Sequence, residues 1–342
     1  MELATSAHAQ SGRSQFGSDV HLLNVTDLTV EFDTERGVVR ALNSVGLSIG
    51  EGETLAIVGE SGSGKTVTTQ AIMGTIQTPP GYITAGRIEY RGRDLLAMSP
   101  RDRRRVRGRK IALITQDALT ALTPTLRVGF QIGEMFRVHG GLGRREARER
   151  SIDVLHRVGI PSAKSRIDDY PHQFSGGMQQ RVMIAMAIAL EPELIVADEP
   201  TTALDVTVQA QVLEVLGDLT SRYGMALLII THDLAMASEI ADQVAVMYAG
   251  RIVESGTAQE VFSAPNHPYT KGLLESIPSP DHAKTLRAIP GHPPDLLALP
   301  PGCSFSPRCT MREEICETDR PLLIQGESGR ASACHFSDRV HE

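Results

Sequence analysis

The segment that most constrains this chain is GESGSGKT at residues 59–66. It matches the pattern G-x-x-x-x-G-K-[ST], follows the apolar run LAIV and precedes a helical pattern. Glycines at this spacing let the backbone curl so that successive N–H groups face an anion, and the helix that follows directs the positive end of its dipole to the same point. The segment therefore predicts a phosphate-binding loop, in which Lys65 reaches the β and γ phosphates and Thr66 offers its hydroxyl to Mg²⁺.

A pair of acidic residues makes the prediction of a nucleoside triphosphate site more specific. The run LIVADEP ends a buried apolar strand with Asp198 and Glu199. Next to a phosphate loop, a carboxylate at Asp198 can hold the Mg²⁺ shell, and Glu199 can take a proton from an attacking water. The pair favours hydrolysis of a nucleoside triphosphate over an ordinary strand end.

The order of apolar runs predicts an α/β fold. Several nearly continuous runs, such as ETLAIVG, ELIVADEP and ALLIITHD, are typical of strands buried on both faces of a largely parallel sheet. The run LLNVTDLTVEF and the polar alternation in GRIEYRGRDL indicate an antiparallel β subdomain. Helical patterns at about 117–190 predict a helical subdomain inserted beside the sheet.

The two ends of the chain differ in amino-acid composition from its centre. Residues 1–20 are small and polar without the basic start and apolar block of a secretory signal, so we expect a disordered tail. The nucleotide-binding domain is expected over residues 21–264. Proline becomes frequent beyond that point, which predicts a smaller C-terminal extension over residues 265–342.

Composition excludes two classes of protein. No stretch approaches the roughly 20 apolar residues that a membrane-spanning helix requires. The formal net charge of −7 argues against nonspecific binding of nucleic acid, which usually needs a basic surface.

Residues 174–181, FSGGMQQR, resemble the signature of ABC ATPases, usually written LSGGQ. Phe174 and Met178 depart from that consensus. The remaining family elements follow in order: the Q-loop glutamine Gln116, the D-loop Ala203, Leu204 and Asp205, and the switch histidine His232. The chain is thereby identified as a member of the ABC ATPase family.

This resemblance implies roles for individual residues. It implies catalytic roles for Glu199, His232 and Gln116, and a Mg²⁺ site at Thr66, Gln116 and Asp198. The residues expected to bind ATP are Phe32, whose ring would stack on adenine, and Gly59, Ser61, Gly62, Gly64, Lys65, Thr66 and Thr68. In this family two nucleotide-binding domains pair head to tail, so Ser175, Gly176, Gly177 and Gln179 would serve the partner's ATP in trans, and Asp205 would belong to the D-loop.

The C-terminal sequence resembles one subfamily of ABC ATPases in particular. NHPYTKGLL at 266–274 and IPGHPPDLLALPPGCSFSPRC at 289–309 are similar to the extension of oligopeptide, dipeptide and nickel import ATPases. That subfamily implies import of peptides and a peripheral position on the cytoplasmic face of the membrane. The implied partners are a second, homologous ATPase subunit, two permease subunits and an extracytoplasmic substrate-binding protein, without nucleic acid.

All four cysteines lie in this extension, at Cys303, Cys309, Cys316 and Cys334. The segment has too few apolar residues to build a core of its own, so a metal staple is a natural expectation. The spacing matches neither standard ferredoxin run and lacks the C-x-x-C pairs of structural zinc sites. The subfamily resemblance favours a [4Fe–4S] cluster, while zinc, with His335 as an alternative ligand, and unligated thiols stay open.

Three rival functions are also considered. A soluble ABC-type ATPase acting on nucleic acid or ribosomes would normally carry two ATPase domains or long insertions, and neither is present in this sequence. A non-hydrolysing partner would be expected to lose the glutamate at position 199. An importer of nickel or another small solute stays open, because the ATPase sequence does not name the cargo.

Overall fold

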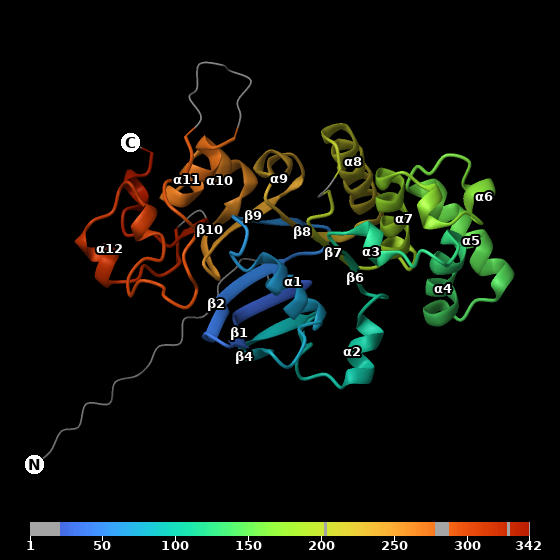
Figure 1. Cartoon of the computed structure of the whole chain (residues 1–342), viewed down its shortest axis with the longest axis horizontal. Coiled ribbons are helices and arrows are strands. Elements are labelled where there is room, and N and C mark those ends of the chain that lie inside the picture. Colours follow the sequence, from blue (N-terminus) through green and yellow to red (C-terminus); the bar gives the residue numbers. More distant parts are fainter. Residues whose placement is uncertain (1–20, 202–203, 278–286, 327–328, 342) are drawn as a thin grey trace, which may run out of the picture.

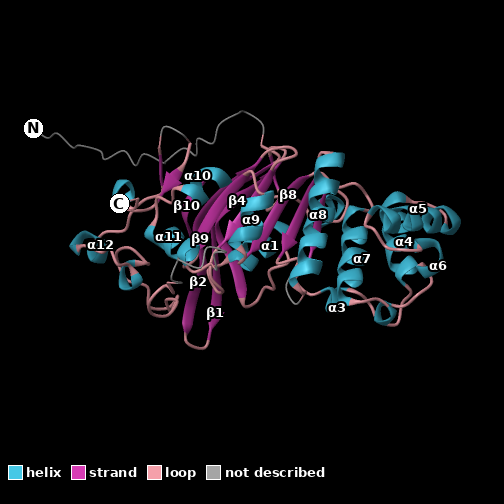
Figure 2. Ribbon diagram, turned by 90° about the horizontal axis from the view of Figure 1, so that it is seen from above, coloured by secondary structure: helices cyan, strands magenta, loops and turns pink. Residues whose placement is uncertain are grey.

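The computed structural model describes residues 21–201, 204–277, 287–326 and 329–341 (Figure 1). The predicted tail, residues 1–20, and Ala203 of the predicted D-loop lie outside these ranges. Figure 2 shows one extended molecule in which a central sheet lies between a helical region at one end and the C-terminal extension at the other.

Within the described residues, eight strands form the main sheet in the order β11-β12-β10-β9-β3-β8-β7-β6. Its centre is parallel, because β9, β3, β8, β7 and β6 all run in the same direction. The ranges of these five strands are β3 (Thr54–Val58), β6 (Ile111–Ile114), β7 (Leu194–Asp198), β8 (Ala226–Thr231) and β9 (Gln243–Tyr248). Every residue of β3, β7 and β8 is buried, as expected for strands covered on both faces, so the predicted α/β class is confirmed.

A second, antiparallel sheet has the order β2-β1-β4-β5. Its strands are β1 (Leu23–Thr34), β2 (Gly37–Ile49), β4 (Gly81–Tyr90) and β5 (Arg93–Asp94). Glu193, the residue before β7, joins this sheet to the main one, since its carboxylate accepts hydrogen bonds from the Tyr90 hydroxyl at 2.7 Å and from Arg91 and Lys110. The antiparallel subdomain expected from the alternating residues is therefore present.

Helices cluster between β6 and β7. They are α3 (Ala118–Ala121), α4 (Val128–Gly140), α5 (Arg144–Arg157), α6 (Ala163–Arg166) and α7 (Gly176–Ile188), with the short turn η1 (Pro171–Gln173), and they form the right-hand lobe of Figure 1. The remaining helices of the core are α1 (Lys65–Met73), α2 (Pro100–Val106), α8 (Val206–Tyr223), α9 (Leu234–Ile240) and α10 (Ala258–Ser263). Among the residues that the structure describes, no helix is both long enough and apolar enough to cross a membrane.

The C-terminal extension is joined to the main sheet. Strand β12 (Ala331–Ser332) pairs with β10 (Arg251–Thr257), and β11 (Ile324–Gln325) extends the edge. Arg330 forms an ion pair at 2.5 Å with Glu254, whose side chain is fully buried. The extension also contains α11 (Pro268–Glu275), η2 (Ser306–Arg308), α12 (Glu314–Thr318) and η3 (Ser337–Arg339).

Candidate functional site

The phosphate loop connects β3 to α1, as the motif predicts. The Lys65 ammonium donates to the carbonyl oxygens of Gly59 at 2.8 Å and Glu60 at 2.9 Å. Burial lowers the pKa of Lys65, and the carboxylates of Glu199, Asp198 and Glu60 oppose that shift. The ammonium is therefore held inside the loop with three carboxylates nearby, in place to meet the phosphates of a nucleotide.

Two glycines of the loop have no room for a side chain. Gly59 has φ 154°, and a Cβ there would lie 2.2 Å from the Met247 carbonyl oxygen. Gly64 has φ 111°, and a Cβ there would lie 2.8 Å from the Ala41 carbonyl oxygen. The loop can therefore curl against its neighbouring strands only because both positions are glycine.

Oxygen ligands suited to Mg²⁺ meet at the start of α1. The Thr66 hydroxyl donates to one Asp198 carboxylate oxygen at 3.3 Å, and Thr69 donates to the other at 3.2 Å. Burial raises the pKa of Asp198, while the bonds from Thr69 and Thr66 oppose the increase. A hydroxyl and a carboxylate so close to a phosphate loop fit Mg²⁺, which prefers oxygen donors.

The three predicted catalytic residues lie together at the ends of adjacent strands. Glu199 follows β7 with φ 45°, an uncommon backbone angle for a residue with a side chain. Its carboxylate accepts a hydrogen bond from the Gln116 amide at 3.2 Å and lies 3.4 Å from Nδ1 of His232. Because β6, β7 and β8 are parallel neighbours, the residues that follow them meet at one edge of the sheet.

These groups line one open pocket over the phosphate loop. Its walls are Phe32, Ala41, Ser61, Gly62, Gly64, Lys65, Thr66, Val67, Gln116, Glu199, His232 and Leu296. Phe32 is thus at the pocket, as the stacking role requires. The prediction for Thr68 is wrong in placement, because its side chain is fully buried and its hydroxyl donates to the Gly64 carbonyl oxygen at 3.1 Å. The neighbouring Val67 lines the pocket instead.

Leu296 is a pocket residue that the sequence analysis missed. It belongs to the C-terminal extension, yet it lines the same pocket as Phe32. Its neighbours hold this segment to the β1–β2 hairpin, since Asp295 pairs with Arg36 at 2.8 Å and a Cβ on Gly37 would lie 3.6 Å from Leu297. No local pattern could have revealed this contact.

The signature residues begin α7. Ser175 is the N-cap and accepts a hydrogen bond from the Met178 amide at 3.4 Å. Gln179 is buried, and its amide donates to the carbonyl oxygens of Pro171 at 2.9 Å and Phe174 at 3.0 Å. Gln179 therefore braces the loop before α7 from inside, which corrects the expectation that it faces a nucleotide.

The D-loop lies against this signature. Asp205 is the N-cap of α8 and accepts a hydrogen bond from the Val208 amide at 3.0 Å. A Cβ on Gly176 would lie 3.6 Å from Leu204 of the D-loop, and a Cβ on Gly177 would lie 2.4 Å from Val208 in α8. Of the described residues, those of the signature and Asp205 do not line the nucleotide pocket of their own chain.

Comparison with known proteins shows the family. The model described as "ABC transporter" matches residues 42–202, and the model "Oligopeptide/dipeptide transporter, C-terminal region" matches residues 253–316. The dipeptide transport ATP-binding protein DppD of Escherichia coli K12 is 48% identical over 316 residues, covering 92% of this chain and 96% of that protein. The chain belongs to the ATP-binding subunits of ABC transporters.

Further relatives support the same assignment. The oligopeptide transport ATP-binding protein OppD of Bacillus subtilis is 50% identical over 306 residues, which cover 89% of this chain and 86% of that protein. Among solved structures, the ATP-binding cassette MJ0796, a dimer in a post-hydrolysis state with ADP and Pi, matches with a TM-score of 0.62 and 26% identity over 69% of this chain and 98% of that one. CbiO1 from Clostridium perfringens matches with a TM-score of 0.61 and 28% identity, over 72% of this chain and 92% of that one. The expected ABC ATPase fold and activity class are confirmed.

The four cysteines of this ABC ATPase line one small cavity in the extension, together with His335. Burial raises the pKa of the Cys303 and Cys309 thiols, and it raises the pKa of Cys334 to about 11. Nε2 of His335 lies 3.0 Å from the Asp319 carbonyl oxygen, so that ring already has a partner. Across the described ranges, no three His, Cys, Asp or Glu side chains are placed to hold a single metal ion.

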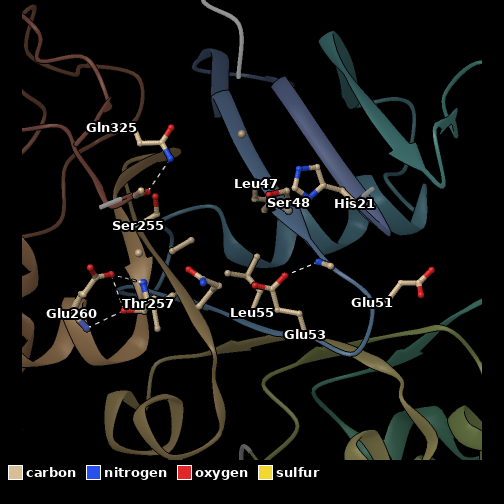
Figure 3. A pocket seen from close by; sticks show the side chains of 17 residues that line it. His21, Leu47, Ser48, Glu51, Glu53, Leu55, Ser255, Thr257, Glu260 and Gln325 are labelled. Carbon is tan, nitrogen blue, oxygen red and sulfur yellow. Dashed lines mark hydrogen bonds between the residues drawn. The ribbon is translucent and has the colours of Figure 1, made fainter. Parts of the chain in front are cut away.

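A second pocket of this ABC ATPase lies at the other end of the parallel strands (Figure 3). It is lined by the starts of β3 and β9, the end of β10 and the turn at Gly50, whose amide donates to Glu53 at 2.6 Å. The phosphate loop follows the carboxyl end of β3, so this pocket is separate from the nucleotide site. It contains none of the residues predicted to act on ATP.

Proposed function

We propose that this chain is the ATP-hydrolysing subunit that energises import of di- or oligopeptides through an ABC permease. The observation that carries the proposal is the match of residues 253–316 to the oligopeptide/dipeptide C-terminal region, on a chain close to half identical to DppD and OppD. Dipeptide transport and oligopeptide transport are what those relatives' names describe.

The geometry supports a division of chemical roles. The loop amides, Lys65 and Thr66 would hold the phosphates, and Thr66 with Asp198 would hold Mg²⁺, which supplies charge neutralisation at the phosphates. Glu199 would accept a proton from the attacking water, because its carboxylate faces the pocket beside the metal ligands. Gln116 and His232 both contact that carboxylate and would orient it and the water.

A complete site would need two chains. The signature residues Ser175 and Gly177 lie at the start of α7, which belongs to the helical lobe, and neither lines the nucleotide pocket of its own chain. In a head-to-tail pair, the start of α7 of one subunit would close the pocket of the other. The partner would be a homologous ATPase subunit, and loss of the γ-phosphate would loosen the pair.

Gln116 would couple hydrolysis to the permease. It follows β6 and precedes α3, so it lies where the sheet joins the helical lobe. A change at Glu199 would pass through Gln116 to the helices expected to contact two permease subunits. The chain would accordingly lie on the cytoplasmic face of the membrane, with cargo delivered by an extracytoplasmic binding protein.

The cysteines would hold a [4Fe–4S] cluster. A multi-iron cluster binds one thiolate at each of several iron atoms, so its ligands need to surround a cavity rather than converge on one ion. The four cysteine side chains line one small cavity of the extension, and this shared position supports the proposal. Cys303, Cys309, Cys316 and Cys334 would be the ligands, and the cluster would serve as a staple because no hydrolytic step needs an electron.

The proposal is tested by reconstitution. The chain, its partner ATPase and its permease in proteoliposomes should hydrolyse ATP faster when a binding protein loaded with a dipeptide is added. The empty binding protein and a Glu199→Gln complex are the controls. Stimulation by Ni²⁺ rather than peptide would favour the nickel alternative, and stimulation by nucleic acid or ribosomes without the permease would overturn the transport function.

A further inference from the structure

Glu60, the second residue of the phosphate loop, has no role in the chemistry described above. Even so, its carbonyl oxygen, its amide and its carboxylate all form hydrogen bonds. Its carbonyl oxygen accepts hydrogen bonds from the Lys65 ammonium at 2.9 Å and the Ser63 amide at 3.2 Å. Its own amide and its carboxylate both bind the C-terminal extension. The position of Glu60 therefore affects both the Lys65 ammonium and the backbone that faces the phosphates.

The carboxylate of Glu60 is bound by Arg308 through a two-pronged pair. One guanidinium nitrogen donates to Oε2 at 2.6 Å and the other to Oε1 at 2.9 Å. The Arg308 side chain is 5% exposed, and its Nε donates to the Pro290 carbonyl oxygen at 2.9 Å. The Glu60 side chain is 26% exposed, so the pair is partly buried. Two parallel hydrogen bonds of this kind fix orientation as well as distance, in contrast to an exposed surface ion pair.

The amide of Glu60 is bound by Tyr269. The Tyr269 hydroxyl accepts that hydrogen bond at 2.8 Å, and its ring is fully buried. The rings of Tyr269, Tyr248 and Phe305 pack together with centroids 4.6 to 5.4 Å apart, and the Arg308 guanidinium lies over Tyr248 and Phe305. Both contacts to Glu60 thus arise from one rigid aromatic cluster between β9 and the extension.

Arg308 and Tyr269, the two residues that bind Glu60, both lie next in sequence to residues that line the cysteine cavity. Arg308 ends the turn η2, between two cavity residues, Ser306 and Cys309. Tyr269 follows His267 and Pro268, which line the same cavity. The structure that encloses the four thiols is therefore the structure that positions the two residues on Glu60.

We propose that Arg308 is a positioning residue for ATP binding: it fixes Glu60, and through Glu60 it holds the phosphate loop in the conformation that accepts the phosphates. The C-terminal extension then sets the ATP affinity of its own chain. A preorganised loop binds more tightly because less conformational freedom is lost when the nucleotide arrives. This inference rests on the ATP binding of the family and not on the cargo, so its test is independent of the proposed peptide transport.

The decisive experiment compares two buried arginines of the extension. Arg308→Met removes the pair to the phosphate loop, whereas Arg330→Met removes the comparable pair to Glu254, whose carboxylate also binds the amides of Asn266 and His267 in the extension rather than the loop. We expect Arg308→Met to raise the Kd of the full chain for a fluorescent ATP analogue about tenfold, the effect of losing one strong interaction. Arg330→Met should lower the melting temperature and leave that Kd within about twofold of wild type.

Two results would overturn the proposal. One is an unchanged Kd in folded Arg308→Met. The other is an equal rise in Kd in Arg330→Met, which would mean that general docking of the extension controls affinity. In the assembled transporter, a positioning role also requires the KM for ATP to rise while kcat at saturating ATP stays within about twofold.

Milder variants keep the test decisive if Arg308→Met does not fold. Arg308→Lys keeps the charge without the fork, and Glu60→Gln keeps the shape without the charge, so each should raise the Kd about threefold. The double variant that carries both changes should have a Kd no higher than the higher Kd of the two single variants, because both changes break the same pair. Additive losses in the double variant would show that the two residues act separately.

Discussion

The Gln116 side-chain amide donates to the Glu199 carboxylate at 3.2 Å, across 83 residues of sequence. His232 approaches the same carboxylate oxygen, with its Nδ1 at 3.4 Å. The glutamate is thus held from two sides by residues that follow neighbouring strands. This arrangement can position a base without contributing to the phosphate cradle, which leads to the first prediction.

Glu199→Gln should leave ATP binding intact and reduce turnover at least about a hundredfold, because it removes the base and keeps the loop. Lys65→Ala should instead weaken ATP binding itself. Nucleotide binding and steady-state ATP hydrolysis of the two variants separate these effects. Near wild-type turnover by Glu199→Gln would contradict the base assignment, and identical defects in both variants would contradict the division of roles.

The second prediction concerns the shared site. A pair of subunits, one carrying Ser175→Arg and the other Lys65→Ala, should retain one intact composite site, whereas a pair carrying Ser175→Arg in both subunits should retain none. ATPase activity of tagged, co-purified pairs distinguishes the two. If the native partner is a different chain, activity should be low until that chain and the permease are added. Full cargo-coupled activity from an isolated monomer would refute the shared site.

The third prediction concerns Leu296. Its side chain lines the nucleotide pocket together with Phe32, so Leu296→Ala should raise the Kd for ATP about threefold to tenfold through lost apolar contact. Leu299→Ala is the matched control, because Leu299 packs against the core and does not line that pocket. We expect the control to lower the melting temperature and leave the Kd unchanged. Equal Kd values for both variants and wild type would exclude a binding role for Leu296.

The fourth prediction concerns the cysteine cavity. Anaerobically purified protein should be brown, absorb broadly at about 400 nm and contain about four iron atoms per chain. Cys309→Ser and Cys316→Ser should each lose most of the iron, since each removes one thiolate. Metal analysis with absorbance spectra checks both statements. Stoichiometric zinc without iron, or iron content that is unchanged in these variants, would reject the cluster.

The fifth prediction is a pH dependence of stability at Glu193. Burial opposes ionisation of this carboxyl, but hydrogen bonds from Lys110, Tyr90 and Arg91 outweigh it and lower its pKa to about 2. A carboxyl whose pKa is lower in the folded state stabilises the fold above its unfolded pKa of about 4.5, and the contribution disappears as the pH falls towards 2.

Glu193→Gln should therefore lower the free energy of unfolding at pH 7 by on the order of 1 kcal/mol, a modest value because the pair is partly exposed. The difference between wild type and variant should stay constant from pH 7 to about pH 5 and shrink below about pH 4.5. Urea unfolding at several pH values measures it. Parallel pH profiles for the two proteins would show that Glu193 does not stabilise the junction between the sheets.

Local sequence was sufficient for the parts of the site that are contiguous in the chain. The phosphate loop, the acidic pair after β7 and the signature are each short segments whose backbone geometry depends on their own glycines and flanking elements. The buried apolar runs likewise predicted a largely parallel sheet, because strands covered on both faces have nearly continuous apolar sequences. The order of the ABC ATPase motifs along the chain then predicted that Gln116 and His232 act with Glu199, and the parallel strands bring the three residues together.

Tertiary packing alone decided which side chains face the nucleotide pocket and which lie beneath it. In the first turn of α1, helix geometry points Thr68 inward and Val67 toward the pocket. The Gln179 side chain is buried because its amide donates to two backbone carbonyl oxygens that precede α7. Arg308 and Glu60 are 248 residues apart and meet only because the extension packs against Tyr248 of β9 and pairs with β10. A contact of that kind depends on the docking of whole elements, and no pattern within either segment records it.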